Sequence, residues 1–556
     1  MPTLVRNMKQ QSASAHNFAM IPRADIPRSS FKMQKNLKTA FSFSYLVPIF
    51  CEEVLPGDTW RGRATVVART ATPIVPVFDN WHLETFFFYV PNRIVWTNWK
   101  KFMGEQANPA DSIAYTIPQV VSPNGGYPIG SLYDYFGLPT VGQVTGGVNV
   151  SNSVLPLRMY NLIYNEWFRD QNLQNSVSVP LTDAADSNTL FNMMLRNKKH
   201  DYFTAALPFV QKGTAVTLPL GTIAPVKTQT TELITGAGTP PLKWRLNSSG
   251  GVPGNATIGA NSGDSTISTT LPTWGGTIFP SNLIADLSTA TAATINQLRQ
   301  SFQIQKLLER DARGGTRLTE IIRAHFGVVS PDARQQRPEF IGGGNVPILL
   351  NAIPQTSATG LTGGTTPAGS LSSTGSAQGG MGFTYSATEH GYIIGLANAR
   401  ADNTYQQGLR RHWSRSTRYD YYFPAFAMLG EQAILNKEIY SVGSATGGLG
   451  GADQDMQVFG YQERWAELRY NPNEITGIFR STAASTLDYW HTAQKFTALP
   501  TLNSTFIADG AIATTQRNFA AGAVTVGQQL LCDIFYDCNV ARPLPMYSVP
   551  GLVDHF

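Results

Sequence analysis

Residue types that support enzymatic chemistry are present in this chain, but not at the spacing of a catalytic motif. The sequence contains no GxSxG nucleophile elbow, no HExxH zinc motif and no Walker phosphate-binding loop. His82 and Glu84 would share one face of a β-strand and could bind a metal, although a cross-strand or interface hydrogen bond is the more common role for such a pair. We therefore predict a protein without enzymatic activity, cofactor or metal site.

Binding chemistry is better represented, because basic residues gather in two stretches. Residues 1–40 contain seven Lys or Arg and one acidic residue in a polar, proline-containing stretch, a composition typical of arms that bind polyanions. In LRRHWSRSTRYDYYF (409–423) arginines are interleaved with aromatic residues, a combination suited to stacking on bases and contacting phosphates. The predicted DNA-facing residues are Arg6, Lys9, Arg23, Arg28, Lys32, Lys35, Lys38, Arg410, Arg411, Arg415 and Arg418.

Both basic stretches also have a structural interpretation. The arm could be a solvated tail, or a tail draped over a subunit interface. If 409–423 is an alternating strand, one face carries Arg411, Trp413, Arg415, Tyr419 and Tyr421. The arginines could then pair with carboxylates or carbonyls of a neighbouring subunit. We favour this interpretation for 409–423 and leave both open for the arm.

The aromatic residues between 80 and 99 raise a question of burial. The stretch NWHLETFFFYVPNRIVWTNW contains seven Phe, Trp or Tyr, four of them consecutive. On a strand, Trp81 and Phe87 would lie on one face and Phe86 and Phe88 on the other, so both faces need cover. We expect a barrel to cover one face, and insertions or neighbouring subunits to cover the other. The predicted subunit-interface residues are Trp81, Phe86, Phe87, Phe88, Tyr89, Trp96, Trp99 and Trp413.

The composition favours a chain whose surface is largely covered by partners. Only 14% of the 556 residues are charged, against about a quarter in typical soluble domains, whereas 11% are aromatic. An all-β protein with long polar loops would have a similar composition. The three cysteines form no CxxC pair, the N-terminus has no apolar signal-peptide core, and no apolar run is long enough to span a membrane. We expect folding in a reducing cytoplasm and no membrane insertion.

Strand patterns occur towards both ends of the chain, with helices and low-charge segments between them. Alternation predicts strands at 37–50, 59–70, 81–90, 412–427 and 522–537, and apolar spacing predicts helices at 92–105, 155–173, 289–315 and 316–327. Segments 213–290 and 341–388 are rich in Gly, Ser and Thr, and we expect an excursion from the core and a low-complexity loop. Without βαβ alternation or repeats, the pattern predicts one large antiparallel barrel or sandwich.

Several long blocks of the chain resemble one protein family. They are FDNWHLETFFFYVPNRIVWTNWKKFMGE, RMYNLIYNEWFRDQNL, FQIQKLLERDARGGTRLTEIIRAHFGVVSPDARQQRPEFIGG, LGEQAILNKEIY, VFGYQERWAELRYNPNEITGIFRS and ARPLPMYSVPGLVDHF. The family is the major capsid protein of gokushoviruses, small single-stranded DNA bacteriophages of the microvirus family. The resemblance extends from residue 37 to residue 556 and is weakest over 213–290 and 341–388.

The resemblance implies an all-β, eight-stranded antiparallel jelly roll of the viral capsid type, with long, partly helical loop insertions. It implies a basic N-terminal arm at 1–40 and a single capsid domain at 41–556. Within that domain, 213–290 would form a surface protrusion near the threefold axes, and 341–388 would be a low-complexity loop.

A structural role follows from the same resemblance. Copies of the chain would self-assemble in the host bacterial cytoplasm into a T=1 icosahedral shell, the virion capsid, around a circular single-stranded DNA genome. The expected partners are further copies of the chain, the DNA, minor virion and scaffolding proteins, and a host receptor contacted by 213–290. The alternative is a carbohydrate-binding or glycan-cleaving β-sandwich whose aromatic residues line a sugar groove.

Overall fold

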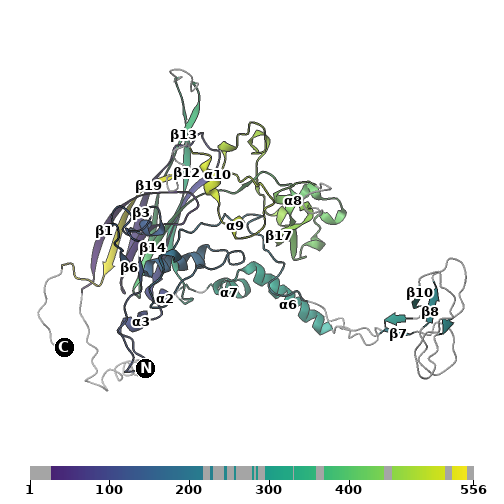
Figure 1. The fold of residues 1–556 in the computed structure, drawn as a ribbon, viewed down its shortest axis with the longest axis horizontal. Helices are drawn as coiled ribbons and strands as arrows, with labels where there is room; N and C mark the ends of the chain where they lie inside the picture. Colours follow the sequence, from purple (N-terminus) through teal and green to yellow (C-terminus); the bar gives the residue numbers. More distant parts are fainter. Residues whose placement is uncertain are drawn as a thin grey trace, which may run out of the picture. The chain divides into compact units, whose positions relative to one another are not determined.

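The computed structural model describes residues 27–216, five short strands between 226 and 285, and residues 295–329, 331–332, 334–357, 368–443, 454–519 and 529–547. The chain divides into two compact units, residues 1–210 with 312–556, and residues 211–311. The first unit contains the main sheet (Figure 1).

The main sheet has eight strands in the described residues. They are β1 (Ser29–Phe41), β2 (Val47–Val54), β3 (Thr59–Thr70), β4 (Trp81–Pro91), β12 (Glu339–Pro354), β13 (Leu371–Ser386), β14 (Gly391–Ala401) and β19 (Leu530–Arg542). Their hydrogen-bonded order is β1-β19-β3-β13-β12-β4-β14-β2, and every pairing is antiparallel. Most neighbours in this order are distant in the chain, as in the two Greek keys of a jelly roll. The predicted eight-stranded, all-β fold is confirmed.

The sheet folds over so that its two four-stranded halves enclose the core. The Phe50 ring of β2 lies 4.9 Å from the Tyr536 ring of β19 and 5.7 Å from the Phe383 ring of β13. The Tyr536 hydroxyl also donates a hydrogen bond to the Ile49 carbonyl, at 2.9 Å. Because β2 belongs to one half of the sheet and β13 and β19 to the other, these contacts join the two halves.

β4 carries the four consecutive aromatic residues, and the chain itself covers both faces of this strand. Trp81 and Phe87 lie in the core between the halves of the sheet. Phe88 and Val90 belong to a second apolar cluster, together with buried residues of α5 (Leu155–Ile163). The predicted division of the aromatic residues between two faces is therefore confirmed, and an insertion of the same chain supplies the outer cover.

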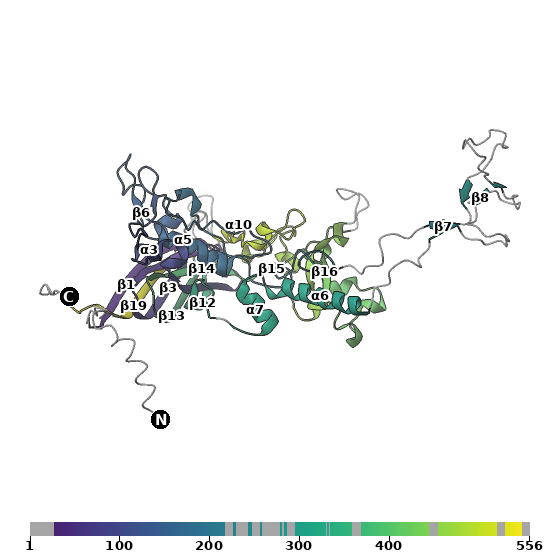
Figure 2. The ribbon, with the colours of Figure 1, turned by 90° about the horizontal axis from the view of Figure 1, so that it is seen from below.

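Two long insertions interrupt the jelly roll. Between β4 and β12 lie α2 (Asn92–Val95), α3 (Trp99–Phe102), β5 (Gln119–Val121), α4 (Leu132–Tyr135), β6 (Ser151–Ser153), α5, a π-helical turn (Tyr164–Phe168), the second unit and α7 (Leu318–Phe326). Between β14 and β19 lie β15 (Thr404–Tyr405), β16 (Glu431–Leu435), α8 (Asn436–Ile439), β17 (Val458–Glu463), β18 (Asn473–Glu474), α9 (Ser504–Ile507), α10 (Ala511–Gln516) and several 3-10 turns. Figure 2 shows α3 and α5 on one side of the sheet.

The predicted helices are largely confirmed. The helix at 155–173 forms as α5 and its π-helical turn, and the helix at 316–327 forms as α7, which ends at Gly327 with a φ of 69°. The prediction at 92–105 was too long, because Trp96 adopts an extended conformation and separates α2 from α3. None of the described helices is long and apolar enough to cross a membrane.

The second unit, residues 211–311, encloses the segment predicted as an excursion. In it β8 (Lys243–Leu246) pairs with β9 (Ala256–Thr257) and β10 (Ile278–Pro280), and β7 (Val226–Thr228) pairs with β11 (Leu283–Ala285). Most of α6 (Ile295–Gly314), the helix predicted at 289–315, also belongs to this unit. Its placement near a threefold axis stays a prediction.

The expectation of a low-complexity loop at 341–388 was wrong. Most of that segment forms β12 and β13, which lie at the centre of the sheet. Small residues are needed there, because a β-carbon on Gly343 would overlap the Thr85 carbonyl of β4. The approach is equally close on the other side of β13, where a β-carbon on Gly62 of β3 would overlap the Phe383 ring. Strands that approach so closely look like low-complexity sequence because their side chains are so small.

Two further boundaries differ from the prediction. β1 begins at Ser29, so residues 29–40 belong to the sheet and not to an arm. The stretch predicted as a strand at 412–427 forms three 3-10 turns, Arg411–Ser414, Arg418–Asp420 and Pro424–Phe426. The Asp420 carboxylate accepts hydrogen bonds from the backbone of Ser416 and Thr417, and such local bonds compete with a strand ladder.

Candidate nucleic-acid and subunit interfaces

Two of the lysines predicted to face DNA lie on the outward side of β1. Lys32 pairs with Asp537 at 3.5 Å and Lys38 pairs with Asp533 at 3.2 Å, both acids being on the neighbouring strand β19. The Lys38 side chain is 76% exposed. Exposed pairs of this kind contribute about 0–1 kcal/mol, so the lysines can exchange a carboxylate for a phosphate at little cost.

The other arm residues are placed differently. Lys35 points to the opposite side of β1 and pairs with Glu52 of β2 at 3.1 Å, which joins the edges of the folded sheet. Arg28 donates a hydrogen bond to the Thr59 hydroxyl at 2.6 Å. Three predicted residues lie outside the described residues: Arg6, Lys9 and Arg23.

β3 adds three arginines that the sequence analysis did not single out. Arg61, Arg63 and Arg69 lie on the outward face of this strand and are exposed. In the described part of the chain, no hydrogen bond or ion pair engages their side chains. Their even spacing along TWRGRATVVART was the available signal, but it does not reveal whether that face of the strand is covered.

The outward residues of β1, β19, β3 and β13 form a surface that we call the open face. Its charged members are Lys32, Lys38, Arg61, Arg63 and Arg69, against two acids, Asp533 and Asp537. Leu531, Phe535 and Val67 are also exposed on it. Helices α3 and α5 lie on the other side of the sheet (Figure 2). The open face is therefore a basic surface that carries a few apolar side chains.

The arginines at 409–423 are engaged by carboxylates of their own chain. Arg411 donates to Glu438 at 3.0 Å, and Arg415 pairs with Glu467 at 3.4 Å. Burial raises the pKa of Glu438, and the Arg411 charge partly offsets this shift. The favoured interpretation was right about carboxylate pairing but wrong to assign the carboxylates to a neighbouring subunit.

The two remaining arginines of this stretch are also in contact with their own chain. Arg410 forms an ion pair with Glu474. The Arg418 guanidinium lies 5.4 Å from the centre of the Phe423 ring. The predicted shared face of Arg411, Trp413 and Arg415 does not form, because the stretch is not a strand.

Most residues predicted at subunit interfaces are buried inside their own chain. Each of these side chains is at most 9% exposed, so it has almost no surface to offer a neighbouring subunit, and the prediction is corrected for Trp81, Phe87, Phe88, Tyr89, Trp96 and Trp99. Phe86 is partly buried against Phe168 and the Arg196 guanidinium. Trp413, at 73% exposed, is free to meet another subunit. Sequence patterns did not find Met428 and Phe78, which are 97% and 70% exposed.

The possible metal pair has a structural role instead. Glu84 accepts a hydrogen bond from Arg400 at 2.8 Å and pairs with Arg196 at 3.2 Å, so its carboxylate is committed to two guanidinium groups. Among the described residues, no group of three or more His, Cys, Asp or Glu side chains could hold a metal ion.

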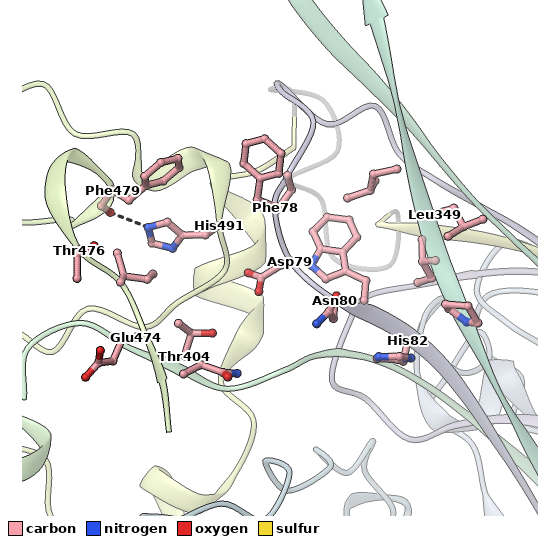
Figure 3. Close-up of a pocket in the computed structure, with 17 residues that line it drawn as sticks. Phe78, Asp79, Asn80, His82, Leu349, Thr404, Glu474, Thr476, Phe479 and His491 are labelled. Atoms are coloured by element: carbon pink, nitrogen blue, oxygen red, sulfur yellow. Dashed lines mark hydrogen bonds between the residues drawn. The ribbon is translucent and has the colours of Figure 1, made fainter. Parts of the chain in front are cut away.

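A cavity of about 940 Å³ opens beside the first residues of β4 (Figure 3). Phe78 and Leu349, both more than half exposed, lie at this cavity, and Asp79 and His491 also line it. Burial raises the pKa of Asp79 and lowers that of His491. No Cys, Ser or Lys lies among its described lining residues. The combination of exposed apolar and polar groups fits a docking surface better than a reaction centre.

Comparison with known proteins shows which protein family the chain belongs to. Residues 19–552 match the family model described as "Capsid protein (F protein)". The chain belongs to this capsid protein family. It is 44% identical to the capsid protein VP1 of Bdellovibrio phage phiMH2K over 558 residues, which cover 97% of this chain and 98% of the relative.

Two further relatives cover both chains almost completely. Capsid protein VP1 of Chlamydia phage 1 is 40% identical over 619 residues, covering 99% of this chain and 100% of the relative. Capsid protein VP1 of Spiroplasma virus 4 is 37% identical over 566 residues, covering 98% and 99%. The resemblance to gokushovirus capsid proteins is confirmed. The protein is a structural, non-enzymatic capsid protein of a virion, and the carbohydrate-binding alternative is set aside.

Proposed function

We propose that this capsid protein closes into a T=1 icosahedral shell around a circular single-stranded DNA genome, and that the open face lines the inside of the shell. The observation that carries this assignment is the set of three exposed arginines on β3 that have no side-chain partner among the described residues. Single-stranded DNA offers one phosphate per nucleotide, and a cationic surface with a few exposed aromatic or apolar side chains is the usual way to hold it without reading its sequence.

The position of the insertions supports the inward direction of the open face. The insertion between β4 and β12 covers the outer side of β4, and the same insertion contains the second unit, residues 211–311. A segment that meets a host receptor must lie outside the shell. The face of the jelly roll that no described insertion covers then faces inward. Arg6, Lys9 and Arg23, which lie outside the described residues, are proposed as further DNA contacts.

Subunit contacts are assigned to exposed apolar residues of the second insertion and of the surface beside β4. Trp413 and Met428 protrude from the 409–430 region, and Phe78 and Leu349 lie at the cavity beside β4. Shell interfaces are built from such groups, because buried aromatic and Met side chains supply most of the binding energy of an interface. Minor virion and scaffolding proteins are further proposed partners of the shell.

Host attachment is assigned to 213–290. This segment lies in a separate compact unit, so it can vary without disturbing the jelly roll. Replacing 217–290 with a short Gly-Ser linker should leave particle formation intact and abolish attachment to host cells. Loss of particles would instead give the segment a structural role, and normal attachment would exclude it as the receptor-binding element.

The experiment that tests the shell proposal is expression of the full chain together with its natural assembly partners. Sedimentation and electron microscopy should then show closed particles of uniform diameter that contain nuclease-protected single-stranded DNA. A chain that stays monomeric in the presence of all its partners would contradict the proposal, and so would particles that never retain DNA.

A further inference from the structure

A second basic feature of the first unit lies away from the open face. It is a cleft of about 670 Å³, formed by the end of the π-helical turn, residues 169–172 and 196–200, residues 313–320 and the end of β14. Seven Lys or Arg side chains line it, against two carboxylates, Asp170 and Glu320. The cationic members, which we call the basic cleft, are Arg169, Arg196, Lys198, Lys199, Arg313, Arg317 and Arg400.

Several of these cations already have carboxylate partners. Arg313 pairs with Glu431, Arg317 with Glu320, and Lys199 with Asp402. Arg196 and Arg400 must share the single carboxylate of Glu84. These ion pairs neutralise most of the positive charge of the basic cleft but leave some of it without a carboxylate partner among the described residues.

Arg169 and Lys198 carry that remaining charge. In the described part of the chain neither of them has a carboxylate within ion-pair distance. Arg169 donates to the Gln174 carbonyl at 2.8 Å, and Lys198 donates to the Gln494 side chain at 2.9 Å. Both contacts are to neutral groups. Carboxylates act on these cations only from beyond ion-pair distance, Glu166 and Asp170 on Arg169, and Asp509 and Asp201 on Lys198.

The basic cleft also contains donors without acceptors. Arg169 Nε, Arg196 Nη1 and Arg317 Nε are buried and have no hydrogen-bond partner in the described residues, and the same is true of the Thr316 hydroxyl. Buried N–H and O–H groups are nearly always satisfied in folded proteins, because leaving one unpaired costs the full energy of its desolvation. Arg317 Nε lies 3.9 Å from a Glu166 carboxylate oxygen, but the other three groups have no such partner in the part of the chain that the structure describes, which indicates that a ligand supplies their acceptors.

The charges of the basic cleft lie close enough to affect one another. Burial lowers the pKa of Arg196 to about 10, and the nearby Arg400 contributes to the shift. Burial and the Arg317 charge also lower the pKa of Arg169. An anion in the cleft would relieve both effects.

We propose that the basic cleft is a binding site for a phosphate group. Guanidinium groups match phosphate oxygens in geometry, and an anion of nearly two negative charges suits two cations that have no ion-pair partner among the described residues. The cleft is larger than inorganic phosphate, and its volume falls in the range of pockets that hold whole small molecules, so a nucleotide is the ligand that fits the space as well as the charge. The proposal does not depend on the shell or on the open face.

The first test is isothermal titration calorimetry on the full chain with inorganic phosphate, a deoxynucleoside monophosphate and a short oligodeoxynucleotide, at constant ionic strength. We expect saturable binding of phosphate and tighter binding of the mononucleotide. If only the oligonucleotide binds besides phosphate, the phosphate group comes from the DNA strand. Absence of saturable phosphate binding, or preference for glutamate or an acidic peptide over phosphate, would overturn the proposal.

Thr316→Val is the most informative variant. The Thr316 hydroxyl has no partner within the described residues, so its removal breaks no internal hydrogen bond and should leave the thermal midpoint of the free chain unchanged. Phosphate binding should weaken several-fold in Thr316→Val, and about tenfold or more in Arg169→Gln, because the latter removes a charge-assisted bond. Lys100→Gln, which removes an exposed charge on α3 outside both basic surfaces, is the matched control and should bind phosphate normally. Unchanged affinity in both cleft variants would contradict the assignment.

Discussion

Arg158 of α5 donates two hydrogen bonds to the Asp186 carboxylate, at 2.7 and 2.9 Å, and both side chains are almost completely buried. The same guanidinium donates to the carbonyls of Val95 and Thr182. One side chain thus joins α2, α5 and the loop before Asp186 into the layer that covers the outer face of β4.

Breaking this pair should be costly. Asp186→Asn leaves the Arg158 charge buried without its counter-charge, and we expect a loss of about 3–5 kcal/mol in the free energy of unfolding. The double variant Arg158→Met/Asp186→Leu should lose less than the single variant, because no unpaired charge remains. Denaturant titration of all three chains checks this. A single variant as stable as the parent would mean that the pair does not hold the layer in place.

Phe50 should contribute strongly to the stability of the core between the two halves of the sheet. Its ring contacts Trp60, Phe87, Phe383 and Tyr536, from both halves of the folded sheet. Phe50→Ala should therefore lower the stability by about 3–5 kcal/mol, and Phe50→Leu by less, because it leaves a smaller cavity. Phe78→Ala is the control, because it removes a largely exposed ring and should lower the stability much less. Equal effects of the two alanine variants would contradict the placement of Phe50 at the centre.

Acid should destabilise the chain through His491. The Ala493 N–H donates to its Nδ1 at 3.1 Å and its Nε2 donates to the Phe479 carbonyl at 2.8 Å, so the ring is neutral in the fold. Burial lowers the pKa of His491 below its ordinary value of 6.5, and Arg517 adds to the shift, whereas Asp79 and Asp488 oppose it.

The direction of the pH effect follows from that shift. The stability that the neutral ring contributes is complete above about pH 6.5 and is lost as the pH falls from there through the pKa of the folded state. Thermal midpoints measured between pH 8 and pH 5 should fall with acid, and the fall should be smaller in His491→Gln. His412→Gln tests for a general effect of removing a histidine. An identical pH dependence of the parent chain and His491→Gln would rule out this assignment.

The open face should set the salt dependence of DNA binding. If Arg61, Arg63 and Arg69 each contact one phosphate, replacing all three with Gln should reduce the log-log slope of affinity against salt by about 2 on single strands. The triple Lys variant keeps the charge and should retain the slope. The control is Lys100→Gln/Lys101→Gln on α3, on the covered side of the sheet. It removes two positive charges, as Arg61→Gln/Arg63→Gln does, but should leave the slope unchanged. A triple Gln variant with an unchanged slope would remove DNA from the open face while leaving shell formation untouched.

The sequence predicted what depends on local pattern. The alternation around Phe86–Tyr89 identified both faces of β4, and apolar spacing identified α5 and α7, because each of these signals lies within one element. The strands β12 and β13 were missed, because Gly343 and its small neighbours show their purpose only where another strand approaches them.

The interfaces depended still more on long-range structure. Trp81 and Phe88 were expected at subunit contacts, but the sequence does not reveal that α5 and the opposite half of the sheet bury them. The carboxylates that engage Arg411 and Arg415 lie 27 and 52 residues further along the chain. For the same reason the regular spacing of Arg61 and Arg63 was visible in the sequence, but not that the insertions, as far as the structure describes them, leave these residues uncovered.

The orientation of the jelly roll in the assembled shell determines which face of the sheet meets the DNA. A cryo-electron microscopy reconstruction of DNA-filled particles should place β1, β19, β3 and β13 on the inner wall, with density for nucleic acid against Arg61, Arg63 and Arg69. A reconstruction in which this face lies on the outer surface, or is buried between subunits, would show that the open face does not line the inside of the shell.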